Sequence, residues 1–276
     1  MAAQSDPEIG SFIQTGPIET NCLDLGEGEP ILFLHGSGPG VTAWANWQLT
    51  LPVLGSRFRC IAPDLAGFGY SKVPEGWTFN RQTWLDQLIA LLDQLGIEKT
   101  HVVGNSFGGA MALALALRQP DRVNRLVLMG SVGVDFPITE GLDRVWGYTP
   151  SIDAMRKVMD VFAYDRALIG EDLVELRYRA SSLPGRAEAF SAMFPAPRQR
   201  WVKALAFDED QLKQINHETL IIHGREDRVI PPENSLRLHH LIDRSELHIF
   251  GRCGHWTQVE HASSFSALVM QFLERP

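Results

Sequence analysis

The chain has 276 residues, 45% of them hydrophobic, and a formal net charge of −8 at pH 7. This length and composition allow a sizeable core, in one large domain or two small ones. The negative charge and the lack of a local basic cluster argue against nucleic acid as a partner. Residues 1–10 show no targeting signal, and no apolar run could span a bilayer. We therefore expect a cytoplasmic protein without a membrane partner.

The cysteines favour neither disulfides nor a metal site. Cys22, Cys60 and Cys253 are an odd number and include no C-x-x-C pair, which argues against a disulfide framework and a zinc knuckle. Cys253 lies two residues before His255, but no second pair of candidate ligands accompanies them. We expect reduced, structural cysteines and no bound metal.

Apolar runs of strand length alternate with helix-length segments along most of the chain. Residues 12–24 predict an antiparallel hairpin at a sheet edge, and apolar spacing predicts helices over 82–95 and 110–118. The other strand-like runs are 31–34, 59–62, 101–103, 125–129, 219–222 and 246–250, and a C-terminal helix is expected from about 260 to 273. This alternation predicts an α/β fold, with a mostly parallel sheet and helices on both faces.

The alternation lapses between about residues 134 and 208. Four short helical patterns follow one another there, separated by prolines, over 151–162, 171–181, 186–193 and 198–206. We predict an inserted helical cap at 134–208, between a first part of the core domain at 1–133 and a second part at 209–276.

The run Gly104-Asn105-Ser106-Phe107-Gly108 lies between a β-branched stretch and a stretch rich in alanine and leucine. This order predicts a strand, a sharp turn and a helix, which is the context of a nucleophile elbow. A serine hydroxyl is a poor nucleophile unless a tight turn exposes it and a base can take its proton. Ser106 is therefore the predicted nucleophile, in preference to an ordinary loop serine.

The predicted base is His255, because it follows the last strand in a loop that contains Gly251 and Gly254. The chain order Ser, Asp, His of α/β-hydrolases places the acid after the preceding strand, where Asp227 stands. Glu226 and Asp135 are alternative positions for that carboxylate. The histidines interpreted as packing or turn residues are His35, His101, His223 and His248, and those interpreted as surface residues are His217, His239, His240 and His261.

Donors for an oxyanion are expected at two places. The first is the backbone N–H of Phe107, directly after the predicted nucleophile. The second is the glycine-rich loop at 35–40, which follows an early strand and lets backbone approach a substrate.

Longer runs of the sequence resemble one family, the meta-cleavage product hydrolases, in core and predicted cap alike. The matching runs are HGSGPGVTAWANW at 35–47, APDLAGFGY at 62–70, GNSFGG at 104–109, LMGSVG at 128–133, MDVFAYD at 159–165, MFPAPRQRW at 193–201 and CGHW at 253–256. The elbow is shared with a whole superfamily, whereas the runs at 35–47 and 193–201 are much more specific.

The resemblance implies an activity and a set of site residues. The family hydrolyses a carbon–carbon bond of 2-hydroxy-6-oxohexa-2,4-dienoates, the ring-opened products of catechols, to 2-hydroxypenta-2,4-dienoate and a carboxylic acid, without a cofactor. The implied catalytic triad is Ser106, Asp227 and His255, and the implied oxyanion donors are the backbone groups of Ser37 and Phe107. The residues implied to contact the substrate are Gly36, Asn46, Asn105, Arg177 and Trp256.

The resemblance also bears on the partner molecules. It implies an anionic small-molecule dienoate as substrate, whose carboxylate suits the planar guanidinium of Arg177. It favours small substituents at C6, including the semialdehyde, and a homodimer or higher homo-oligomer. We expect the pocket for the C6 substituent to come from the cap and from residues 131–137.

Other functions stay open at this point, because a fold and a triad do not determine the substrate. One is an esterase or peptidase of the same fold, and another is a non-catalytic ligand receptor. Haloalkane dehalogenases and epoxide hydrolases are disfavoured, since they need an aspartate where Ser106 stands. Attack by serine or by water activated by histidine is likewise undecided.

Overall fold

A single twisted sheet of eight strands organises the chain, in the order β1-β2-β4-β3-β5-β6-β7-β8. The computed structural model describes residues 6–275; residues 1–5, part of the stretch searched for a targeting signal, and residue 276 lie outside that range. The strands are β1 (Ser11–Thr15), β2 (Ile18–Leu25), β3 (Pro30–Leu34), β4 (Arg59–Pro63), β5 (Thr100–Asn105), β6 (Val123–Met129), β7 (Thr219–Gly224) and β8 (Ser245–Phe250). Only β2 runs antiparallel to its neighbours, β1 and β4, so the sheet is mostly parallel as predicted.

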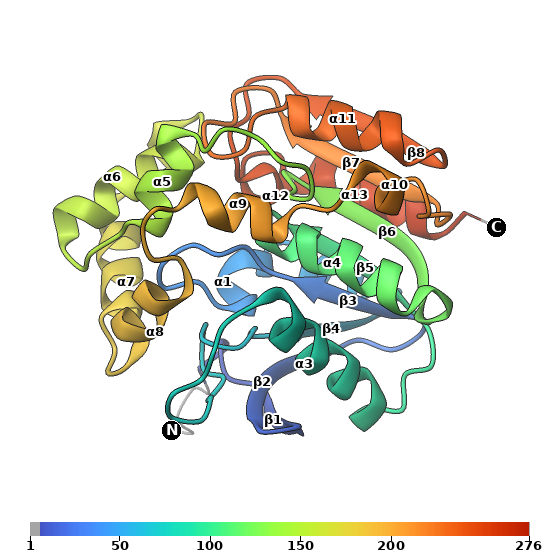
Figure 1. Ribbon diagram of the computed structural model, residues 1–276, viewed down its shortest axis with the longest axis horizontal. Coiled ribbons are helices and arrows are strands. Elements are labelled where there is room, and N and C mark those ends of the chain that lie inside the picture. The colour runs from blue at the N-terminus through green and yellow to red at the C-terminus, as the bar shows by residue number, and fades with distance from the viewer. Residues whose placement is uncertain (1–5, 276) are drawn as a thin grey trace.

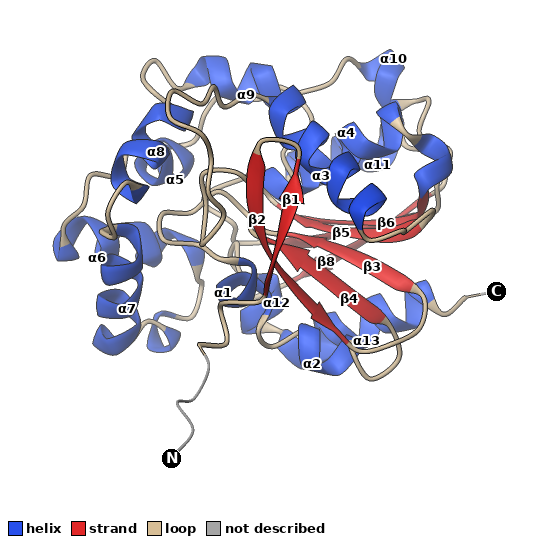
Figure 2. Ribbon diagram, turned by 90° about the horizontal axis from the view of Figure 1, so that it is seen from below, coloured by secondary structure: helices blue, strands red, loops and turns tan. Residues whose placement is uncertain are grey.

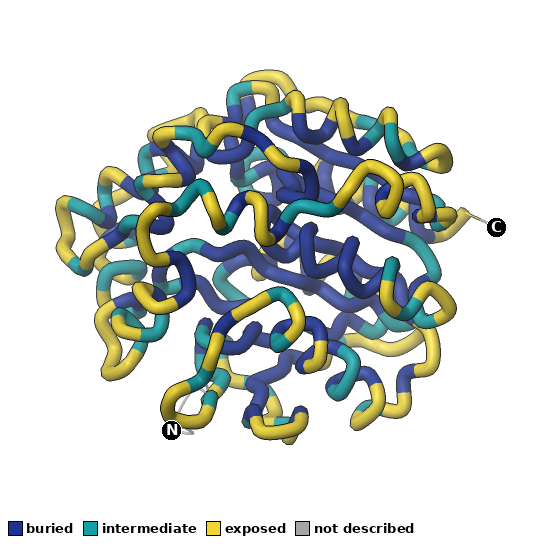
Figure 3. The backbone as a smooth tube through the Cα atoms, in the orientation of Figure 1, coloured by how far each residue is buried: buried dark blue, intermediate teal, exposed yellow. Residues whose placement is uncertain are grey.

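Helices cover both faces of the sheet (Figure 2). Buried residues of α3, α4 and α11 form one hydrophobic core with one face, and those of α1, α2 and α13 form a second core with the other. The helices are α1 (Ala43–Trp47), α2 (Leu51–Leu54), α3 (Arg81–Gln94), α4 (Phe107–Arg118), α5 (Glu140–Trp146), α6 (Ile152–Phe162), α7 (Glu171–Ser181), α8 (Arg186–Met193), α9 (Gln199–Leu205), α10 (Glu209–Leu212), α11 (Glu233–Leu241), α12 (Thr257–Glu260) and α13 (Ala262–Leu273), with short 3₁₀ helices η1 (Pro120–Arg122) and η2 (Arg166–Leu168). Figure 3 shows the resulting gradient from buried strands to exposed outer helix faces. Within residues 6–275, every helix is too short or too polar to cross a bilayer.

Helices α5 to α8 gather beyond one end of the sheet, at the left of Figure 1, and α9 leads back toward the core. The segment that carries them leaves and rejoins the core at one place, where the N–H of Phe207 donates to the carbonyl of Gly133 at 2.9 Å. Side chains of α5, α6 and α7 share a cavity with loops that follow the carboxyl ends of β3, β5, β7 and β8. The residue limits of a separate cap stay a prediction.

The predicted strands, the edge hairpin and the long helices are confirmed, but several boundaries differ. Helix α4 begins at Phe107, three residues before the predicted start, and so includes Gly108. A β-carbon at Gly108 would lie 2.2 Å from the carbonyl oxygen of Leu34, so glycine is required there by close packing. The predicted C-terminal helix is divided into α12 and α13 at His261.

The sequence does not predict five helices, α1, α2, α5, α10 and α11, for lack of a periodic signal. Helices α1, α2 and α10 have only four or five residues. Helix α5 has seven residues, too short a window to give a helical pattern. Helix α11 is longer, but its three leucines do not form one buried stripe: Leu236 is exposed, Leu238 is buried and Leu241 is half-buried.

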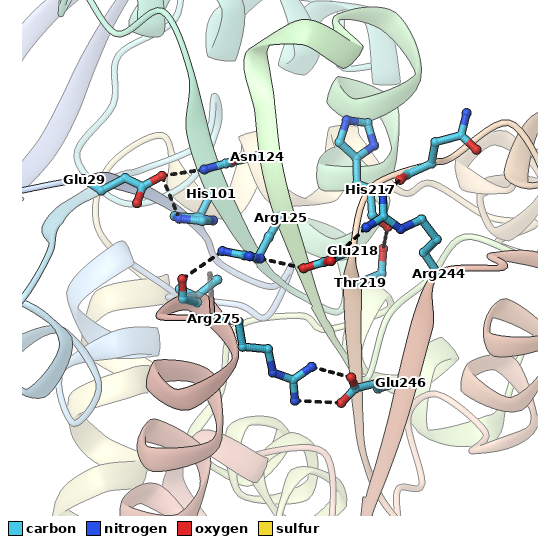
Figure 4. Close-up of polar contacts among 12 residues, drawn as sticks. Glu29, His101, Asn124, Arg125, His217, Glu218, Thr219, Arg244, Glu246 and Arg275 are labelled. Atoms are coloured by element: carbon cyan, nitrogen blue, oxygen red, sulfur yellow. Dashed lines mark hydrogen bonds and ion pairs between the residues drawn. The ribbon is translucent and has the colours of Figure 1, made fainter.

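The amino ends of the parallel strands carry a network of charged side chains (Figure 4). Glu218, directly before β7, accepts hydrogen bonds from Arg125 of β6 and from Arg244, each at 2.8 Å. Arg275 pairs with Glu246 of β8. These ion pairs connect three strands and the C-terminal segment at the end of the sheet opposite to the cavity.

Candidate active site

Ser106 occupies a sharp turn between β5 and α4. Its φ of 53° and ψ of −112° are unusual for a residue with a side chain, as expected at a strained nucleophile elbow. Gly104 permits this turn, because a β-carbon there would lie 2.5 Å from the carbonyl oxygen of Gly108. The N–H of Ser106 donates to the carbonyl of Met129 at 2.8 Å, which attaches the turn to the neighbouring strand.

Asp227 and His255 meet in loops after β7 and β8. Nδ1 of His255 donates to Oδ2 of Asp227 at 2.7 Å, while Oδ1 accepts the N–H groups of Val229 at 2.7 Å and Ile230 at 3.0 Å. This arrangement leaves Nε2 of His255 free of Asp227, and the His255 side chain lines the same cavity as Ser106. The two residues are thus placed for proton exchange between hydroxyl and imidazole.

Burial and the hydrogen-bond partners of Asp227 shift the pKa of its carboxyl in opposite directions. Burial alone raises the pKa of the carboxyl, but the charge interaction with His255 and hydrogen bonds from His223 and His255 bring that pKa below its ordinary value. The second imidazole, His223, was interpreted from sequence as a packing or turn residue. It is buried in β7 as such a residue would be, but its contact with Asp227 was not foreseen.

The alternative acids lie elsewhere. Glu226 accepts the N–H of Cys253 at 2.9 Å and the Nε–H of Arg225 at 2.9 Å, and Asp135 is exposed. The geometry therefore favours Asp227 as the partner of His255.

The cysteines offer no rival nucleophile. All three are free and buried, and burial raises the pKa of Cys60 and of Cys253 to about 12. Thiols with such pKa values stay protonated near neutral pH. Within residues 6–275, no group of three or more His, Cys, Asp or Glu side chains is arranged to hold a metal ion.

The two expected oxyanion donors belong to the helix that follows Ser106 and to the glycine-rich loop after β3. Phe107 begins α4, and the first N–H groups of a helix have no acceptor within the helix. Ser37 lines the cavity from the glycine-rich loop, and its Oγ accepts the indole N–H of Trp146 from α5 at 2.9 Å. This bond connects the loop to the helical segment beyond the sheet.

His35 supports the start of the same loop. Its Nδ1 lies 2.7 Å from the carbonyl oxygen of Gly36, and its Nε2 accepts the N–H of Leu65 at 2.9 Å. A protonated ring would direct a second N–H against that of Leu65. Burial, the dominant cause, lowers the pKa of His35 to about 4 despite the favourable contact with Gly36.

We expect His35 to make folding stability depend on pH between about 6.5 and 4. Its pKa is lower in the folded chain than the value of about 6.5 in an unfolded one, so its contribution is complete above pH 6.5 and decreases as the pH falls. The expected loss is about 2 kcal/mol at pH 5. Urea unfolding at several pH values should show a smaller decrease for His35→Gln, which has no titratable ring and keeps an acceptor for Leu65.

The comparison with His35→Gln is needed because another buried group changes the folding stability with pH in the opposite direction. Burial raises the pKa of Asp64 to about 6, so its contribution to stability grows as the pH falls. If the unfolding free energies of the wild type and His35→Gln change in parallel with pH, His35 is not the titrating group.

The residues implied to contact substrate surround the same cavity. Gly36, Asn46, Asn105, Arg177 and Trp256 all line it, together with Ser37, Ser106 and His255, whereas Asp227 and Phe107 do not. Asp227 lies behind His255, and the expected contribution of Phe107 is a backbone N–H.

Two side chains of this cavity have unused donors. Oδ1 of Asn46 accepts the N–H of Gly36 at 3.3 Å, while its Nδ2 is buried without a hydrogen-bond partner among the described residues. Arg177 donates to the carbonyl of Gly40 at 2.9 Å and lies 6.0 Å from the ring centre of Trp256. Residues 6–275 contain no ion pair with Arg177, and burial lowers its pKa although Glu8 raises it. A half-buried cation without a carboxylate partner fits an anionic ligand.

The cavity also has apolar lining. The apolar side chains from the helical segment are Leu142, Val145, Met155, Met159 and Phe162, joined by Val229 of the loop after β7. The expectation that residues 131–137 also line it is wrong for this cavity. Val132 and Val134 are buried but do not line the cavity, and the Oγ of Ser131 donates to the carbonyl of Val132.

Phe162 connects these apolar side chains to the loop that carries His255, the expected base. Its carbonyl accepts the N–H of His255 at 2.6 Å, and its ring stacks on Trp256 with 5.0 Å between ring centres. The helical segment thus helps to set the position of the loop that carries His255.

Comparison with known proteins agrees with this fold and cavity. Residues 29–262 match the family model described as alpha/beta hydrolase fold. The chain is 58% identical to a 2-hydroxymuconate semialdehyde hydrolase of Pseudomonas sp. (strain CF600), covering 99% of this chain and 96% of the relative. It is 57% identical to a 2-hydroxy-6-oxo-2,4-heptadienoate hydrolase of Pseudomonas putida, with 96% of each covered.

A solved structure gives the same result. A variant of the meta-cleavage product hydrolase CumD from Pseudomonas fluorescens IP01 is 54% identical, with a TM-score of 0.96 and coverage of 97% of this chain and 98% of that one. The chain belongs to the α/β hydrolase fold family and, within it, to the meta-cleavage product hydrolases.

Proposed function

We propose that this protein is a serine-type hydrolase of a carbon–carbon bond in 2-hydroxy-6-oxohexa-2,4-dienoates, the ring-opened products of catechols. The observation that carries the proposal is a single cavity that contains Ser106 and His255 together with the unused donors of Arg177 and Asn46. The names of its relatives, hydrolases of a muconate semialdehyde and a heptadienoate, support it. No cofactor takes part in the proposed reaction.

The polar and apolar side chains of the cavity suggest how the substrate lies. The carboxylate of the dienoate is proposed to bind Arg177 and the amide of Asn46, since a guanidinium and a carboxylate form strong, charge-assisted hydrogen bonds. The C6 substituent then extends toward the apolar side chains contributed by α5 and α6.

The proposed reaction begins with a proton shift. The dienol becomes its keto tautomer, with His255 as the proton shuttle, because only the keto form offers an electron sink beside the bond to be broken. Ser106 then attacks the C6 carbonyl while His255 takes its proton, and the backbone N–H groups of Ser37 and Phe107 stabilise the tetrahedral oxyanion.

Collapse of this intermediate breaks the bond between C5 and C6. The electron pair passes into the conjugated keto acid, which takes up a proton and leaves as 2-hydroxypenta-2,4-dienoate, while C6 stays on Ser106 as an ester. Water activated by His255 hydrolyses the ester and releases the carboxylic acid.

The direct test measures bleaching of the coloured dienoate by the purified protein. We expect 2-hydroxymuconic semialdehyde to yield formate and 2-hydroxypenta-2,4-dienoate in equal amounts. Turnover of simple esters without bleaching of the dienoate would contradict the proposal and favour an esterase. Binding of the dienoate without turnover of either substrate would favour a receptor.

Arg177 provides a sharper test of the proposed orientation. We expect Arg177→Gln to raise KM for the dienoate by about 10- to 100-fold, because a hydrogen bond to a charged group contributes about 1.5–3 kcal/mol. Arg179→Gln is the matched control, since Arg179 is exposed and bonded to Glu175 one turn away. Equal KM values for the two variants would place the carboxylate elsewhere.

The size of the C6 substituent is also part of the proposal. We propose that hydrogen and methyl are preferred, as the names of the two relatives suggest. Catalytic efficiencies across dienoates with hydrogen, methyl, isopropyl and phenyl at C6 test this. A best rate with the phenyl compound would contradict it.

We further propose that residues 134–208 act as a cap over the cavity, and that the protein is a cytoplasmic homodimer or higher homo-oligomer. The cap is supported by the meeting of Gly133 and Phe207, and the assembly by the family relationship. Light scattering after size-exclusion chromatography measures the assembly, and a monomer at working concentrations would contradict it.

A further inference from the structure

The carboxylate of Asp227 lies between two imidazole rings. His255 contacts Oδ2 at 2.7 Å from the cavity side, and Nε2 of His223 contacts the same oxygen at 3.2 Å. His223 belongs to β7, its side chain is completely buried, and it does not line the cavity. It therefore reaches Asp227 from within the protein, where it cannot touch a substrate.

The other contacts of His223 determine which nitrogen carries a hydrogen. Nε2 lies 3.0 Å from the carbonyl oxygen of Ile230, and a carbonyl can only accept, so Nε2 bears a hydrogen. Nδ1 lies 2.6 Å from Oγ of Ser235, at the start of α11. In the neutral ring Nδ1 accepts the Ser235 hydroxyl hydrogen. The Nε2–H group is then shared between Ile230 and Asp227.

We propose that His223 is a positioning residue, which donates its Nε2–H to Oδ2 of Asp227 and holds that carboxylate in the orientation that meets Nδ1 of His255. Ser235 in turn fixes the tautomer and the angle of the His223 ring. The inference rests on the proposed roles of Ser106, Asp227 and His255, and adds a support that lies outside the triad.

This support also affects the basicity of the pair formed by Asp227 and His255. A carboxylate that loses one hydrogen-bond donor accepts more strongly from its remaining partner, so Oδ2 of Asp227 holds the protonated His255 ring more tightly when His223 no longer donates. The other titratable side chains near Asp227 are few: Cys253 interacts with it only through charge, and Glu226 points to the backbone of Cys253 and to Arg225. Neither can replace the donor.

Two substitutions of His223 distinguish the contribution of Nδ1 from that of Nε2. His223→Asn places an amide where Nδ1 contacted Ser235 but is too short to reach Asp227. His223→Gln places an amide N–H where Nε2 stood and so restores the donor. The rate of Ser106 labelling by a fluorophosphonate, measured against pH, reports the nucleophile and its base without any assumption about the natural substrate.

For His223→Asn we expect the acid limb of the labelling profile to move upward by about one pH unit, and labelling below that limb to fall about tenfold. For the dienoate we expect kcat to decrease with KM nearly unchanged, since His223 is outside the cavity. His223→Gln should return the acid limb to within about a third of a unit of the wild type.

His101 provides the matched control for lost stability. It is also a completely buried strand histidine, but it lies at the opposite end of the sheet, 3.1 Å from Glu29 (Figure 4). His101→Asn should lower the melting temperature and leave the acid limb unchanged. If His223→Asn behaves in the same way, His223 is merely structural and the proposal is wrong.

Two further outcomes keep the test decisive. If His223→Asn does not fold, Ser235→Ala takes its place, and an unshifted acid limb in that variant overturns the proposal. If the wild type is labelled by the fluorophosphonate but does not bleach the dienoate, the proposed substrate is wrong, and the labelling profiles still decide the role of His223.

Discussion

Replacing Ser106 by alanine is expected to lower kcat for the dienoate by on the order of 10⁴- to 10⁶-fold, as for other serine triads. The loss is chemical, because alanine tolerates the same backbone angles about as well as serine and the turn is set by Gly104 and Gly108. Stopped-flow bleaching measures kcat, and the melting temperature should stay within a few degrees of the wild type.

Ser266→Ala is the control for this substitution. Ser266 is equally buried, lies in α13, and its Oγ has no hydrogen-bond partner among the described residues, so its removal should leave kcat unchanged. If Ser106→Ala kept more than about a hundredth of the wild-type kcat, attack by water activated by His255 would replace the acyl-enzyme route.

Asp227→Asn is expected to lower kcat by about 10³- to 10⁴-fold through the wrong tautomer of His255. The N–H groups of Val229 and Ile230 require the amide oxygen at the Oδ1 position, so the NH₂ group faces Nδ1 of His255. That nitrogen must then accept, the ring hydrogen moves to Nε2, and the imidazole cannot take the proton of Ser106.

The neighbouring Glu226 tests this assignment. Its carboxylate accepts an N–H from Cys253, and Glu226→Gln can keep that bond, so we expect kcat to stay within about threefold of the wild type. A larger loss in Glu226→Gln than in Asp227→Asn would exchange the roles of the two acids.

The parts of the site that the sequence could predict are those under strict local constraints. Ser106 needs glycines at fixed positions around a strained turn, and His255 and Asp227 follow strands in a fixed chain order. The glycine spacing and the chain order can both be recognised in the amino-acid sequence. The same holds for the central strands β3 to β7, whose apolar runs are largely buried.

The remaining parts depend on contacts between distant segments. The role of His223 beside Asp227 follows from the angle of the loop after β7, and no periodicity encodes it. A usable signal was its place at the carboxyl end of a parallel strand, where α/β proteins build their sites. The wrong expectation for residues 131–137 has a similar cause: only tertiary packing decides that Val132 and Val134 are buried without lining the cavity.

The ion pairs at the amino ends of β6, β7 and β8 (Figure 4) have a consequence for engineering. They are separated by the length of the sheet from the cavity at its carboxyl ends, and substitutions at distant, independent sites contribute additively. Substitutions around Glu218 and Glu246 that change stability can therefore be tested separately from substitutions at Val145 or Met159, which line the proposed pocket for the C6 substituent, and the two sets can then be combined.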